Sequence, residues 1–276
     1  MSASAAGTAW NAMMIGFAVT PPTMPMAGLP DDPAARRDAL KKLTAAVTRT
    51  AEGMAELHKA FASGEPMTRE AKQKEIDRVM HDLDNATSTL GAARVARIRA
   101  ALGLAREAFL AAELPATAAH GEADAGNFLV HGWDEKDKTF RDLGMIDVES
   151  MRETLVGGKG AWQQRGTGTA AADIGRFLES LEAMAPGKLT DGERTDLHDA
   201  FVDQYFKATP SRAQPVERAL DWFRIGAELV AVKNGDASAA SAPLARCDQA
   251  SAGASGRWRA LASSTRMGWG CDSSRA

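Results

Sequence analysis

Acidic and amide side chains gather in residues 120–149, where two apolar runs are joined by a polar turn. Glu122 and Asn127 stand five residues apart at the start of the first run, with Asp124 between them. Asp147 follows the second run. If the chain turns between Glu122 and Asn127, their side chains can approach the same bound group from two sides. A β-hairpin would then bring Asp147 back beside them. In such a site, one carboxylate would act as a base toward a hydroxyl group, and the other oxygens would bind a cation.

The same spacing occurs in kinase catalytic loops, where an acid addresses the substrate hydroxyl and an asparagine five residues later binds Mg²⁺. HGEADAGN, residues 120–127, resembles the HGDxxxxN loop of the aminoglycoside phosphotransferase and choline kinase group of small-molecule kinases. GMIDVE, residues 144–149, resembles the metal-binding strand end of that family. Further pieces agree in order: a Leu-His pair in residues 51–61, a Leu-Pro lead-in to the loop, and AADIGRFLESL with Asp173. The similarity spans roughly residues 35–235 and covers one lobe only.

The resemblance implies a mainly α (α+β) fold, that of the protein-kinase C-terminal lobe, with a small β-hairpin at the catalytic and metal site. It implies an ATP-dependent phosphotransferase that moves the γ-phosphate to a hydroxyl of a small molecule, with Mg²⁺ and ATP as cofactors. Glu122 would orient and deprotonate that hydroxyl. Asn127 and Asp147 would hold the metal and its nucleotide, and Glu149 would support the metal shell. Asp124 is either a surrogate base or a loop-capping residue.

Two features depart from the family. Its catalytic acid is Asp, and the extra methylene of Glu122 moves the carboxylate by about one bond length, where ~1 Å can cost ~10²-fold in rate. A kinase also needs an N-terminal lobe with a phosphate-covering loop and a strand lysine, yet fewer than about 35 residues precede the first helical pattern. The chain alone is therefore expected to bind Mg-ATP weakly and to transfer phosphate slowly or not at all.

Three alternatives stay open. The first is a non-catalytic or truncated kinase-like lobe that serves as a binding module. In the second, a partner chain supplies the missing lobe and completes the cleft. The third, weaker, is a plain helical interaction protein with an unrelated polar hairpin.

Three further polar residues are expected to have structural roles. His120 would brace the loop by hydrogen bonding. Asp173 would lie at a helix N-terminus, where its carboxylate meets backbone N–H groups. His58 is expected to be a packed or capping histidine and not a ligand.

Composition limits the class of protein. The chain has 276 residues, 45% hydrophobic and 25% charged, which is enough to bury a core. Its net charge of −3 gives no electrostatic footprint for nucleic acid or an anionic membrane. The two cysteines, Cys247 and Cys271, form no disulfide or zinc pattern, so the cytoplasm is the expected compartment. No apolar run approaches the ~18 residues of a membrane span.

Three regions are expected along the chain. Residues 1–30 would be an extended linker or a remnant of the N-terminal lobe, because prolines keep them extended. Residues 31–234 would form the kinase-like lobe. Residues 235–276, rich in Ala, Ser and Gly, would be a low-complexity, disordered tail.

Apolar residues at three- and four-residue spacing predict the helices. They are expected at residues 33–62, after Thr68, at 92–112, at 171–185, after Thr190 and from Pro215. The hairpin is expected around residues 127–148, packed on the helices 33–62 and 92–112, with its turn at 132–138. The glycine-rich residues 156–170 lack the Walker pattern and are expected to form a loop over the site.

Overall fold

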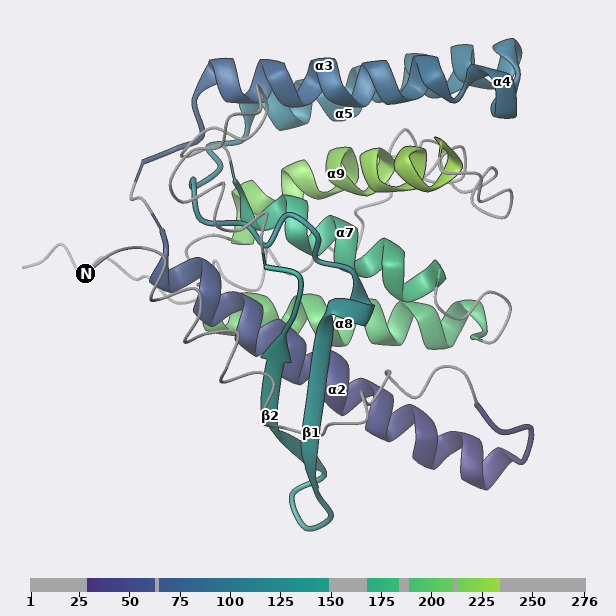
Figure 1. Ribbon diagram of the computed structural model, residues 1–276, viewed down its shortest axis with the longest axis vertical. Helices are drawn as coiled ribbons and strands as arrows, with labels where there is room; N and C mark the ends of the chain where they lie inside the picture. The colour runs from purple at the N-terminus through teal and green to yellow at the C-terminus, as the bar shows by residue number, and fades with distance from the viewer. Residues whose placement is uncertain (1–28, 63–64, 149–167, 184–188, 211–212, 234–276) are drawn as a thin grey trace, which may run out of the picture.

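The computed structural model describes residues 29–62, 65–148, 168–183, 189–210 and 213–233 (Figure 1). The expected tail, nearly all of the expected linker and most of the glycine-rich loop lie outside the described residues. The described part is mainly helical and holds one two-stranded antiparallel sheet, which confirms the mainly α prediction with a small hairpin. No described helix is both long and apolar enough to cross a membrane.

The first helices begin where the capping residues predict. Helix α2, Pro33–Ala60, follows Asp32, whose carboxylate accepts a hydrogen bond of 2.8 Å from the backbone N–H of Ala35. Helix α3, Arg69–Asn85, follows Thr68, whose hydroxyl accepts one from the third helical residue. The glycine at position 91 has a φ of 79° and separates the short α4, Thr87–Leu90, from α5, Ala92–Ala111.

Three helices follow the hairpin: α7 (Ala170–Ala183), α8 (Asp191–Ala208) and α9 (Ala213–Lys233). Helix α8 starts with the predicted capping box, in which Thr190 and Glu193 each bond to the other's backbone N–H. Helix α9 begins slightly before Pro215, which lies in the first turn, where the missing N–H of proline costs nothing.

The hairpin consists of β1, Phe128–Asp134, and β2, Thr139–Met145, in the register Phe128↔Met145 to Asp134↔Thr139. Its first strand is longer than predicted and its turn shorter. The reason is that the carboxylate of Asp134 accepts hydrogen bonds from the backbone N–H groups of residues 136 and 137, which closes the turn after position 134. The second strand ends at Met145, so the apolar residues after it are not strand.

The hairpin packs on α2, as predicted, but its second support is α7 and not α5. The ring of Phe128 meets Phe177 of α7 edge-on at 5.5 Å, and Phe177 stacks on Phe201 of α8 at 4.7 Å. Helix α5 packs mainly against α3 and α9, where Phe109 stacks on Trp222 at 5.6 Å. Figure 1 shows α3 and α5 as an outer layer at the top, α9 and α7 below it, and the hairpin beside α2. The aromatic contacts therefore tie the base of β1 to the helical core.

Candidate functional site

The loop that begins at His120 is held in place by the buried carboxylate of Asp173. Asp173, in the first turn of α7, accepts hydrogen bonds from the backbone N–H groups of His120 (2.6 Å) and Gly121 (3.0 Å). It also pairs with Nε2 of His58 at 2.9 Å, and Nδ1 of that ring lies 2.9 Å from the Tyr205 hydroxyl. All but Gly121 are almost fully buried. The structural roles expected for Asp173 and His58 are confirmed, although the carboxylate caps the loop and not its own helix.

The loop turns back on itself between the predicted acid and the predicted amide. Nδ2 of Asn127 donates to the backbone carbonyl of Glu122 at 2.8 Å, and the backbone N–H of Asn127 donates to the carbonyl of Asp124 at 2.8 Å. Residues 125–127 form a single 3₁₀ turn. Because the amide nitrogen of Asn127 is engaged, its oxygen is the atom that can serve as a ligand.

The second predicted acid is returned to the loop by the end of the hairpin. The backbone N–H of Ile146 donates to the carbonyl of Asn127 at 3.0 Å, and Nε2 of His120 donates to the carbonyl of Ile146 at 2.9 Å. His120 is thus the expected brace. Asp147 follows with a φ of 58°, a left-handed conformation that Asp tolerates better than most residues. Its exposed side chain then lies beside Glu122.

The carboxyl groups of Glu122 and Asp147 lie close together. The interaction with Asp147 raises the pKa of Glu122, its partial burial and the negative charge of Asp147 raise the pKa further, and Arg176 lowers it. Two carboxylates cannot lie in contact unless a proton or a cation separates their charges. The structure therefore brings Glu122, Asn127 and Asp147 together in one place.

Asp124 has a different environment. Nε and Nη2 of Arg176 donate to its two carboxylate oxygens at 3.0 and 2.8 Å, and Nη1 of the same arginine donates to the carbonyl of Gly121 at 3.0 Å. An Asp with both oxygens engaged suits a loop-holding role better than that of a base. The sequence analysis missed Arg176. Its position three residues after Asp173, on the same face of α7, is the signal that could have found it.

The donor atoms available at this site are all oxygens. In the described part of the chain, no group of three or more His, Cys, Asp or Glu residues could hold a metal ion. The site therefore offers the two carboxylates of Glu122 and Asp147 and the amide oxygen of Asn127. Mg²⁺ suits such a set, because it is bound through one or two carboxylates together with water and substrate phosphates. Glu149, the third predicted metal ligand, lies outside the described residues.

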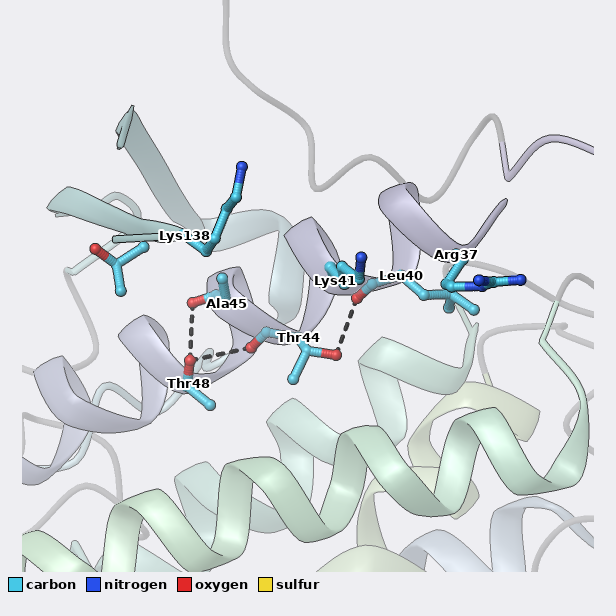
Figure 2. Close-up of a pocket in the computed structure, with 8 residues that line it drawn as sticks. Arg37, Leu40, Lys41, Thr44, Ala45, Thr48 and Lys138 are labelled. Atoms are coloured by element: carbon cyan, nitrogen blue, oxygen red, sulfur yellow. Dashed lines mark hydrogen bonds between the residues drawn. The ribbon is translucent and has the colours of Figure 1, made fainter. Parts of the chain in front are cut away.

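An open groove of about 510 Å³ lies elsewhere, between residues 37–48 of α2 and the tip of the hairpin (Figure 2). Two of the cations that line it have acidic partners: Lys41 pairs with Asp38 at 3.3 Å and Lys138 with Glu135 at 2.6 Å. The groove lies at the opposite end of β2 from the carboxyl pair and includes none of the predicted site residues.

Comparison of the chain with protein-family models, with curated proteins and with solved structures finds no match. The kinase resemblance therefore rests on the residues of the loop and the strand end and on the geometry they adopt.

Proposed function

We propose that residues 31–234 form the C-terminal lobe of an ATP-dependent phosphotransferase that acts on a hydroxyl group of a small molecule. The observation that carries the proposal is the contact between the carboxyl groups of Glu122 and Asp147, which are 25 residues apart in the sequence. Raised proton affinity in a partly open cluster of acids is typical of sites that bind a cation or move a proton. Asn127 adds the amide oxygen that the kinase spacing requires.

The proposed roles follow from the contacts. Asp147 and Asn127 would hold the cation, Asp147 from the end of the hairpin and Asn127 from the turn of the loop. Mg²⁺ bound there would neutralise the negative charge of the nucleotide phosphates. Glu122 would accept the proton of the acceptor hydroxyl. The backbone contacts of the loop keep these groups in place, which matters because phosphoryl transfer depends on positioning and charge stabilisation.

A second candidate, a binding module that holds a cation or nucleotide without transfer, is favoured by one specific contact. The carboxyl of Glu122 points to Asp147 and is engaged there. A carboxylate that binds the cation is a poor base for a hydroxyl group, and general-base catalysis typically raises the rate ~10²–10⁴-fold. This candidate predicts binding with little or no turnover.

Calorimetry of the full chain with Mn²⁺ and with Mg-ATP, together with an assay of ATP consumption, separates the two. For the phosphotransferase we expect cation binding that Asp147→Asn weakens by at least about tenfold, and ATP consumption that both Asp147→Asn and Glu122→Gln abolish. The matched control is Asp142→Asn, an exposed acid on β2 that pairs with His131 at 3.3 Å. Binding without ATP consumption, also when candidate hydroxyl acceptors are supplied, would favour the binding module or a cleft that a partner chain completes. Unchanged Mn²⁺ affinity in Asp147→Asn would exclude both.

A further inference from the structure

Helix α7 contacts the loop through three side chains on one face. Asp173, Arg176 and Ser180 are spaced three and four residues apart, which places them in a row along the helix. The carboxylate of Asp173 accepts hydrogen bonds from the backbone N–H groups of His120 and Gly121, the first two residues of the loop. Oγ of Ser180 accepts a hydrogen bond of 2.7 Å from the backbone N–H of Ala125. Glu122 thus lies between two points at which α7 holds the backbone.

Arg176 is the middle member of this row, and its contacts enclose Glu122. It donates to the carbonyl of Gly121, the residue before Glu122, and forms a two-pronged ion pair with Asp124, the second residue after it. A two-pronged arginine–carboxylate pair fixes direction as well as distance. The side chain of Arg176 is 36% exposed and that of Asp124 42%, so the pair lies at the rim of the site and not in the core.

We propose that Arg176 is a positioning residue that sets the place of the Glu122 carboxyl relative to Asp147, and so the geometry of the cation site. The inference rests on the proposed function, because the proposed function is what requires a cation at this site. Arg176 acts through the backbone carbonyl of Gly121 and the carboxylate of Asp124, which lie on either side of Glu122. Its charge also opposes the repulsion between the neighbouring acids.

The sign of the effect on cation affinity distinguishes positioning from simple charge. A positive side chain near a cation site repels the cation, so its removal alone would tighten binding. Loss of positioning has the opposite effect, and removing a group that orients a metal ligand typically weakens binding ~10–100-fold. Weaker binding in a folded Arg176→Ala protein therefore indicates the loss of positioning.

The experiment measures Mn²⁺ affinity of the full chain by the paramagnetic resonance signal of the free ion, for Arg176→Ala and Arg176→Lys. We expect about tenfold weaker binding in Arg176→Ala and a smaller loss in Arg176→Lys, which keeps the charge but not the two-pronged pair. Arg141→Ala is the matched control, because Arg141 pairs with Asp134 on the hairpin, away from the site. Wild-type or tighter affinity in a folded Arg176→Ala protein would overturn the proposal, and Arg176→Lys decides if Arg176→Ala does not fold.

Hydrogen exchange supplies a readout that needs no cation. The backbone N–H groups of Asp124 and Asn127 donate within the loop at 2.7 and 2.8 Å. We expect both to exchange several-fold faster in Arg176→Ala and at the wild-type rate in Arg141→Ala. Unchanged exchange of both would overturn the positioning role, whatever the Mn²⁺ result. If the wild-type chain binds no Mn²⁺, the proposed function fails, and hydrogen exchange alone then decides whether Arg176 orders the loop.

Discussion

Replacing Asp173 with asparagine removes the acceptor on which the loop rests. The carboxylate accepts three hydrogen bonds, two from backbone N–H groups and one from the ring of His58, and is 1% exposed. The side chain of asparagine has one acceptor oxygen, and its NH₂ group would face a donor. At least one buried donor then loses its partner.

The magnitude follows from these contacts. A hydrogen bond to a charged group contributes about 1.5–3 kcal/mol, and an unsatisfied buried group costs about 1–3 kcal/mol. Because the amide side chain would keep part of the network, we expect Asp173→Asn to lower the free energy of unfolding by about 2–4 kcal/mol. For a folded region of this size, that corresponds to a fall in Tm of roughly 5–12 °C.

Thermal unfolding at neutral pH measures this, with Asp38→Asn as the matched control. Asp38 also lies on a helix and pairs with a lysine, but its side chain is 74% exposed. We expect the control to change the free energy of unfolding by less than about 0.5 kcal/mol. If Asp173→Asn lowers the free energy of unfolding by no more than Asp38→Asn does, the carboxylate of Asp173 does not hold the loop. The argument that the loop is held in a fixed geometry would then fail.

Two further predictions concern stability. A Cβ on Gly175 would lie 2.9 Å from Cβ of Phe223, where α7 and α9 cross, so we expect Gly175→Ala to lower Tm, whereas Gly192→Ala, with nothing within 4 Å, should raise it slightly. The ion pair with Arg36 lowers the pKa of Glu193 to about 2, so its stabilisation is complete above pH ~4.5 and is lost as the pH falls toward 2. Glu193→Gln should therefore lower Tm at neutral pH, and the difference in Tm from wild type should shrink in acid. A difference that stays constant with pH would contradict the assignment.

Local interactions were the ones that the sequence predicted well. The starts of α2, α3 and α8 depend on a side chain and a backbone N–H group three residues apart, so the chain carries both partners in one short segment. The break at Gly91 depends on a single left-handed residue. The hairpin was expected from alternating apolar residues, and only the ends of its strands were misplaced. Hydrogen bonds from backbone N–H groups to the carboxylate of Asp134 close the turn, and an apolar pattern does not reveal such polar contacts.

Contacts between distant segments could not be predicted in the same way. The pairing of His58 with Tyr205 joins residues 147 positions apart, and nothing in either helix specifies the other. The second support of the hairpin was assigned to the wrong helix for the same reason, since α5 and α7 both present apolar faces. The pair of Asp124 with Arg176 is an intermediate case, because the helix positions of Asp173 and Arg176 imply that both face the same loop.

The contact between Glu122 and Asp147 has a consequence for the chemistry. With Asp at position 122, the carboxyl would end about one bond length closer to the loop backbone, and a hydrogen bond cannot stretch by ~1 Å and persist. The contact with Asp147 thus depends on the extra methylene group of Glu122. In the proposed phosphotransferase, a cation at this site would favour the ionised form of Glu122, which is the form that accepts a proton from a hydroxyl group. Cation binding and the activation of the base would therefore be linked in this chain.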